Sequence, residues 1–254
     1  MKSIFSAIHL CTAVILCCTM WISCTKSHPD NVTVPMKELI LLKEITLPFE
    51  EPSGIAFSDP LQRMWVVSGG DQLVHMLDTN GNDQKQLSFV GVDLEGIAFD
   101  ALDSTLWVVD EGTKIISHLD LNGKVLYQKQ LNYSSKPNKG PEGITIGKSH
   151  TLLVINEFDP SVLFELDDKY NIAVTHQLNF ASDYSDISYD QPSGTLFILS
   201  DESKAFFRMD ENIKAIEQYV LPTDKNEGIA FDGGRNVFYI VNDAANTLSW
   251  FKVK

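Results

Sequence analysis

Cysteine is scarce in this 254-residue chain, and basic side chains are few. All four cysteines, Cys11, Cys17, Cys18 and Cys24, lie in or at the edge of an N-terminal apolar run. The remainder of the chain therefore has no disulfide framework, no thiolate metal site and no catalytic thiol. Lys and Arg together number 20 against 34 Asp and Glu, which gives a net charge of −14. Such a chain repels nucleic acid, so we expect no nucleic-acid partner.

The N-terminal segment carries one charge, Lys2, before the apolar run IFSAIHLCTAVILCCTMWIS. This pattern is typical of a secretory signal. The run is short and has too few flanking charges for a membrane-spanning helix. Ile22-Ser23-Cys24 resembles the end of a bacterial lipobox, although Trp21 stands where that motif prefers Leu. We therefore expect a lipoprotein signal peptide at 1–23, lipidation of Cys24, a linker at 24–37, and attachment to a membrane of the bacterial cell envelope. The alternatives are an uncleaved anchor and ordinary secretion.

A repeat organises the rest of the chain. The hexapeptide EGIAFD occurs at Glu95–Asp100 and again at Glu227–Asp232, and looser versions begin at Ser53, Glu142 and Ser185. The residues at the second position, Gly54, Gly96, Gly143, Asp186 and Gly228, are 42, 47, 43 and 42 residues apart. A period of this length is typical of solenoids and propellers. The longest interval contains an insertion, KPNKGP, at 136–141, which we expect to be a surface loop or to overhang the site described below.

Each of the first four repeats contains signals for four strands. The hexapeptide region is followed by a buried strand (MWVVSG, LWVVDE, LLVINE, LFILSD or FYIVND), then by an alternating strand, a turn and a further strand. The fifth unit stops after its third strand, while an unpaired strand-like segment at 38–47 precedes the first unit. The sequence therefore predicts an all-β fold at 38–254. It is a five-bladed β-propeller of four-stranded antiparallel blades, closed by the N-terminal strand, which completes the last blade.

Most of the repeated residues have structural roles in this arrangement. We expect the isoleucines and aromatic residues to pack between blades, where each contributes roughly 1.5–3 kcal/mol by burial. These are Ile55, Ile97, Ile144, Ile187, Ile229, Trp65, Trp107, Phe197 and Tyr239. We expect the aspartates of the outer hairpins to form turns, because Asp is a frequent turn residue. They are Asp78, Asp120, Asp167 and Asp210.

The remaining acids define a candidate site. In an up-and-down blade, the start of the first strand and the end of the second lie on the same face, close to the axis. The acids and Asn amides at these positions should therefore converge at one mouth of the central channel, and oxygen ligands without His or Cys favour Ca²⁺. The predicted metal ligands are Glu95, Glu142, Glu227, Asp110, Glu157, Asn156, Asp201 and Asp243. The alternative is that these residues cap loops by accepting backbone hydrogen bonds.

The motifs EPSGIAF, DLEGIAFD, GPEGITIG, SDISYD and NEGIAFD, each followed by its second strand, resemble those of the SdiA-regulated (YjiK-like) family of bacterial envelope proteins. The resemblance extends from about residue 38 to residue 254. It implies a five-bladed propeller distantly related to NHL-repeat propellers, with calcium near the acidic motifs. It implies no particular activity.

Three functions are compatible with these features. The favoured one is an envelope-anchored calcium-binding module that receives a small molecule, a glycan or an envelope protein. The second is a metal-dependent hydrolase or lactonase, in which Glu142, Asn156 and Asp201 would hold the metal. The third is a purely structural role. No catalytic residue can be named from the sequence.

Overall fold

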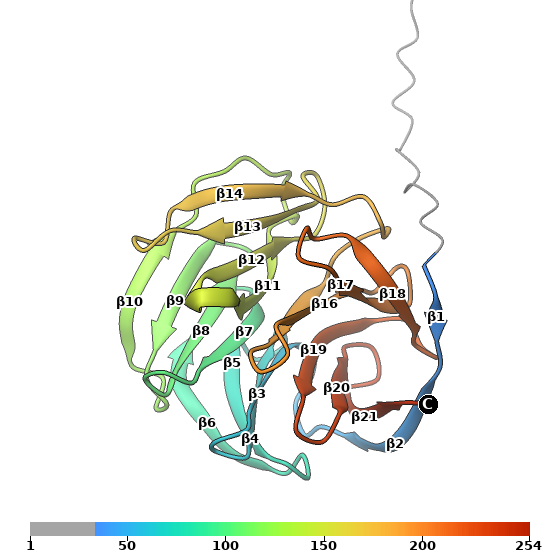
Figure 1. Ribbon diagram of the computed structural model, residues 1–254. Coiled ribbons are helices and arrows are strands. Elements are labelled where there is room, and N and C mark those ends of the chain that lie inside the picture. Colours follow the sequence, from blue (N-terminus) through green and yellow to red (C-terminus); the bar gives the residue numbers. More distant parts are fainter. Residues whose placement is uncertain (1–33) are drawn as a thin grey trace, which may run out of the picture.

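The structure is a computed structural model that describes residues 34–254. The predicted signal peptide, Cys24 and most of the predicted linker lie outside these residues. Five sheets surround a central axis (Figure 1). Each has four antiparallel strands, which follow chain order from the axis outward in the first four sheets. In the fifth sheet the outermost strand comes from the N-terminal part of the chain, and the fourth sheet carries one further, parallel strand at its outer edge. The predicted five-bladed propeller is therefore confirmed. Within the described residues, no helix has the length and apolar character needed to span a membrane.

The inner two strands of the successive blades are β3 (Pro52–Ser58) and β4 (Arg63–Ser68), β7 (Leu94–Asp100) and β8 (Thr105–Asp110), β11 (Pro141–Ile146) and β12 (Leu152–Asn156), β15 (Asp186–Asp190) and β16 (Thr195–Ser200), and β19 (Asn226–Asp232) and β20 (Val237–Asn242). The outer strands are β5 (Leu73–Asp78) and β6 (Asp83–Val90), β9 (Ile115–Leu119) and β10 (Val125–Gln130), β13 (Val162–Leu166) and β14 (Ile172–Gln177), β17 (Ala205–Met209) and β18 (Ala215–Val220), and β21 (Thr247–Val253) with β2 (Leu39–Thr46). A 3₁₀ turn, η1 (Lys148–His150), joins β11 to β12.

The N-terminal strand closes the ring as predicted. β2 pairs antiparallel with β21, from Leu39 opposite Val253 to Thr46 opposite Thr247. The preceding β1 (Met36–Lys37) falls inside the predicted linker, yet it pairs parallel with β18 on the outer edge of the fourth blade. One short stretch of chain thus spans two neighbouring blades (Figure 1).

The outer hairpins show why aspartate recurs in the repeat. In blade 1, Asp78 Oδ1 accepts hydrogen bonds from the backbone N–H groups of Asn80 and Asn82, at 2.8 and 3.0 Å. Asp120, Asp167 and Asp210 make the same pair of contacts in their own hairpins. Bonds to the ionised carboxylate stabilise the turn, so the predicted turn role is confirmed.

Aromatic and β-branched side chains fill the spaces between blades. Trp65, Trp107, Phe197 and Tyr239 are 0–4% exposed. Trp65 of the first blade stacks on Phe99 of the second, with ring centroids 5.0 Å apart. This packing confirms the inter-blade role predicted for the large residues, and it fixes the inner strands that carry the acids.

Candidate metal centre

The acidic residues gather in a cavity at one mouth of the channel. The cavity has a volume of about 430 Å³ and receives side chains from all five blades. It lies where the first strands begin and the second strands end, as predicted. Of the predicted ligands, those that line it are Glu95, Glu142, Glu157, Asp201, Glu227 and Asp243.

A recurring backbone contact places these side chains. In blade 2, the N–H of Glu111, just after β8, donates to the carbonyl of Asp93, just before β7, at 2.8 Å. The equivalent bond links Asp243 to Lys225 in blade 5 at 2.9 Å. This bond joins the residue that follows the second strand to the residue that precedes the first strand. The residue after the second strand is therefore held at the mouth.

The residue one position earlier has a different role. Asp110, the last residue of β8, directs its carboxylate into the adjoining loops, where it accepts hydrogen bonds from the N–H groups of Val92 (2.7 Å) and Thr113 (2.9 Å). Asn156 at the end of β12 donates to the carbonyl of Pro160 (2.7 Å) and is fully buried. The structure thus does not bring Asp110 and Asn156 to the cavity. Both residues behave as the loop caps of the alternative interpretation.

The ligand set considered for a hydrolase is consequently not assembled. Asn156 is committed to its loop, and Asp201 pairs with Lys225 at 2.9 Å. Among the three residues, only Glu142 faces the cavity without an ion-pair partner in the described chain. The geometry gives this alternative no support.

Two lysines that the sequence analysis missed divide the acidic ring. Lys225 pairs with Asp201 and lies 3.8 Å from Glu227, while Lys139, from the 136–141 insertion, contacts both carboxylate oxygens of Glu157 at 2.8 and 2.6 Å. The insertion therefore reaches over the mouth, the second of the two possibilities that its sequence left open. Acids on the remaining side, Asp93, Glu95, Glu111 and Glu142, form no ion pair with Lys or Arg within residues 34–254.

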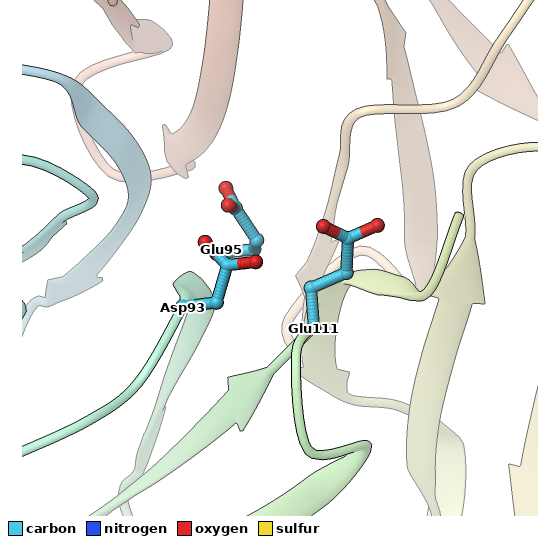
Figure 2. A group of neighbouring side chains, drawn as sticks. All are labelled: Asp93, Glu95 and Glu111. Atoms are coloured by element: carbon cyan, nitrogen blue, oxygen red, sulfur yellow. The ribbon is translucent and has the colours of Figure 1, made fainter. Parts of the chain in front are cut away.

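These unpaired acids lie close together. One carboxylate oxygen from each of Asp93, Glu95 and Glu111 falls within 4.8 Å of the others, and the same holds for Glu111, Glu142 and Glu157. Figure 2 shows Asp93 and Glu95 at the start of β7, with Glu111 across from them and the carboxylates directed to the same side. Glu111 is common to both groups, so the two groups form one continuous cluster.

Burial and mutual repulsion raise the pKa of three glutamates at this mouth, Glu95, Glu142 and Glu227. Burial, with the charges of Asp93 and Glu111 nearby, raises the pKa of Glu95 from 4.5 to about 8. Burial, with the charges of Glu95 and Glu111 nearby, raises the pKa of Glu142 well above 4.5. Burial and the charge of Asp201 raise the pKa of Glu227 to about 7, partly offset by Lys225. A cation at this mouth would replace the protons on these glutamates.

A useful sequence signal was overlooked at the position three residues before the repeated glycine. It holds Glu51, Asp93, Gly140, Asp183 and Lys225. The four charged members of this set all line the cavity.

The fourth repeat is also distinctive, because Asp186 replaces the glycine and fills the axis. Its Oδ2 accepts from Ile229 N at 2.8 Å, while its Oδ1 is buried without a partner among the described residues.

The fold is shared with solved structures of low sequence identity. Glutaminyl cyclase of Myxococcus xanthus has 10% identity and a TM-score of 0.69, over 87% of this chain and 98% of that one. A streptogramin B lyase has 12% identity and a TM-score of 0.54, over 85% and 98% of the two chains. A Bacteroides thetaiotaomicron protein of unknown function has 13% identity and a TM-score of 0.58, over 81% and 60%. At such identities the likeness shows the fold alone.

Among curated proteins, none matches this chain. The SdiA-regulated family, by contrast, matches residues 37–248, which include all but the last few residues of the propeller. The resemblance seen in the repeated motifs is thereby confirmed: this chain belongs to the SdiA-regulated family.

Proposed function

We propose that the acidic mouth binds Ca²⁺, with Asp93, Glu95, Glu111 and Glu142 as the principal protein ligands. The observation that carries the proposal is a cluster of converging carboxylates without a cationic partner in the described chain. Two carboxylates about 5 Å apart repel by roughly 3 kcal/mol at an effective dielectric constant of 20. Such a cluster is stable only with bound protons or with a cation.

The residue types and the number of converging carboxylates favour calcium over magnesium. All available ligand atoms are oxygens, which suits both ions. Calcium–oxygen distances of 2.3–2.6 Å place ligands on opposite sides of the ion about 4.6–5.2 Å apart, whereas magnesium requires about 4.0–4.2 Å. Oxygens that lie within 4.8 Å of one another can reach either sphere. Mg²⁺ usually binds through one or two carboxylates and keeps several waters, whereas Ca²⁺ takes six to eight oxygen ligands, so four converging carboxylates favour calcium. Glu157 would complete the site by releasing Lys139 and binding the ion. Asp201, Glu227 and Asp243 lie on the other side of the mouth, next to Lys225.

The protein would act as an envelope-anchored binding module. The cavity is large enough for a small ligand or for a side chain of a partner, and the ion would add a positive centre within an acidic rim. A small molecule, a glycan or a loop of an envelope protein with oxygen donors would complete the coordination of the ion. The Lys139 loop and the neighbouring blade loops would determine which ligand enters.

Calcium is expected to co-purify with the protein and to stabilise it. With a dissociation constant near 10 μM, 1 mM Ca²⁺ adds about 2.7 kcal/mol of unfolding free energy, which raises Tm by roughly 5–10 °C. Metal content is measured by mass spectrometry, and melting curves are compared in EDTA, in Ca²⁺ and in Mg²⁺. Glu142→Gln should abolish the calcium-dependent rise.

Two control variants separate calcium binding from general stability. Glu202→Gln changes an exposed acid of the same cavity and should keep the calcium response. Asp110→Ala removes a loop cap and should lower the free energy of unfolding by about 1–2 kcal/mol, with a similar fall in Tm with and without calcium. Protein without bound metal and without a calcium response would contradict the proposed site.

We propose membrane attachment through a lipid on Cys24. Cys24→Ser should move the protein from the membrane fraction to the soluble fraction of the host cell, because the thiol is the acceptor of the lipid. Immunoblotting of fractionated cells gives the distribution, with Cys18→Ser as the matched control. Equal membrane association of the Cys24→Ser and unmodified proteins would contradict lipidation and would favour an uncleaved anchor.

A further inference from the structure

The channel has a second cavity at its opposite mouth, and its character is different. It has a volume of about 680 Å³ and is lined by residues from the ends of the first strands. The hexapeptide explains the contrast: its glutamate begins the strand at the acidic mouth, and its phenylalanine lies four residues further on. At about 3.3 Å per residue, the two side chains are separated by about 13 Å. The axial Asp186 lies between the two cavities, since Ser185 lines the first and Ile187 the second.

Aromatic rings surround this second mouth. Equivalent positions in four blades hold Phe57, Phe99, Tyr189 and Phe231, and blade 3 has Ile146. Each of the four rings is half-buried, because one side packs on the blades and the rest faces the cavity. Phe99 stacks on Trp65, and Phe231 packs against Phe238 with centroids 4.5 Å apart. The rings are therefore held in place before any ligand arrives, which limits the entropy lost on binding.

Two hydroxyl groups are available next to these rings. Ser188 and Thr145 occupy the position where the other repeats have alanine. Their oxygens accept hydrogen bonds from the backbone N–H groups of Phe231 and Tyr189, each at 3.2 Å. Across residues 34–254, neither hydroxyl donates a hydrogen bond. Each can offer its proton to an acceptor atom of a ligand.

The carboxylates that line this mouth are already engaged. Asp100 pairs with His150 at 3.0 Å, Asp190 accepts from Ser193 N at 3.2 Å, and Asp59 accepts from the Gln62 side chain at 2.9 Å. Among residues 34–254, the acidic groups that converge closely enough to hold a metal ion lie at the other mouth. The net charge of −14 disfavours an anion. What remains is apolar contact on ring faces and hydroxyl donors, Ser188 and Thr145 among them.

We infer that the aromatic mouth is a binding site for an uncharged organic molecule that carries a flat ring and a hydrogen-bond acceptor. The cavity volume lies in the range of small-ligand sites, about 300–1,000 Å³. Rings of the ligand stack against the aromatic wall, and its acceptor receives the proton of Ser188 or Thr145. This site is distinct from the calcium site and does not depend on it.

Prodan, a neutral naphthalene with one ketone, has these properties and reports binding by a blue shift of its fluorescence. Titration of the purified protein should give saturable binding of one prodan per chain, equal in EDTA and in calcium. Ala101→Trp places a large side chain at the rim of the aromatic mouth, where Ala101 is exposed. It should weaken binding at least tenfold. Ala244→Trp makes the same change at an exposed loop beside the acidic mouth and should leave binding unchanged.

Melting curves of both tryptophan variants establish that they are folded. Absence of saturable binding to the unmodified protein would overturn the inference. Equal prodan affinity of the unmodified protein and Ala101→Trp would also overturn it, because the probe would then lie elsewhere. Failure of calcium binding would leave this result intact, since the two titrations use different mouths and different variants.

Discussion

Replacing Gly96 by alanine is expected to destabilise the propeller by more than about 4 kcal/mol, a loss that few single substitutions cause. A Cβ atom on Gly96 would lie 2.4 Å from the carbonyl oxygen of Glu142 and 2.8 Å from the Cα of Gly143. Both atoms belong to the backbone of the next blade, so no side-chain rotation relieves the overlap. Blades 2 and 3 would have to separate at the axis, which also displaces Glu95 and Glu142 from one another.

Urea denaturation of Gly96→Ala and Gly234→Ala tests this expectation. Gly234 follows β19 at the opposite face, and a Cβ there would meet its nearest atom at 3.4 Å, an ordinary contact. Its substitution should change stability by no more than about 0.5 kcal/mol. If Gly96→Ala unfolds at the same urea concentration as the unmodified protein, close backbone approach does not explain the repeated glycine.

Metal-free protein is expected to lose stability as the pH rises from 5 to 8. In the unfolded chain the glutamates titrate near 4.5, whereas in the folded protein burial raises the pKa of Glu227 to about 7 and that of Glu95 to about 8. Between these values the folded state binds more protons than the unfolded state, so the free energy of unfolding falls with increasing pH. The loss should be on the order of 3 kcal/mol. This is less than the two pKa shifts alone would give, because water in the cavity screens part of the repulsion.

Calcium should reverse this dependence. The ion binds ionised carboxylates, so its contribution to stability grows from pH 5 to pH 8. Melting curves at several pH values, in EDTA and in calcium, measure both slopes. Glu95→Gln should flatten the EDTA profile, whereas Glu202→Gln, which alters an exposed acid, should keep it. An EDTA profile that is flat from pH 5 to 8 would show that the carboxylates of the mouth are not strained when ionised.

The architecture was predictable because the repeat fixes the number of blades and the missing strand fixes the closure. The segment at 38–47 has the length and composition of a strand, and only the fifth unit lacks one. β1 was not predictable, since Met36 and Lys37 carry no periodicity. Their pairing with β18 follows from the path that the chain takes past blade 4 on its way to β2.

Prediction of the site was less complete, for a geometric reason. Asp110 and Glu111 are adjacent acids at the end of one strand, where the alternation of faces gives way to a turn. The sequence does not distinguish the residue that turns into the loop from the one that faces the axis. The lysines were missed because their partners lie far along the chain: Lys225 pairs with Asp201, 24 residues earlier. Attention to the residue three positions before each glycine would have found Lys225 and Asp93.

The pairing of β2 with β21 also determines when the ring can be finished. Ser249 and Glu44, which contact each other across this pair, are 205 residues apart in the chain. A contact of such separation forms late, because a long loop must close first. Blades 1–4 contain all their own strands in order, but the fifth waits for the C-terminal residues to leave the ribosome. If the chain is exported as we propose, the ring would close only after the C-terminal strand has also crossed the membrane.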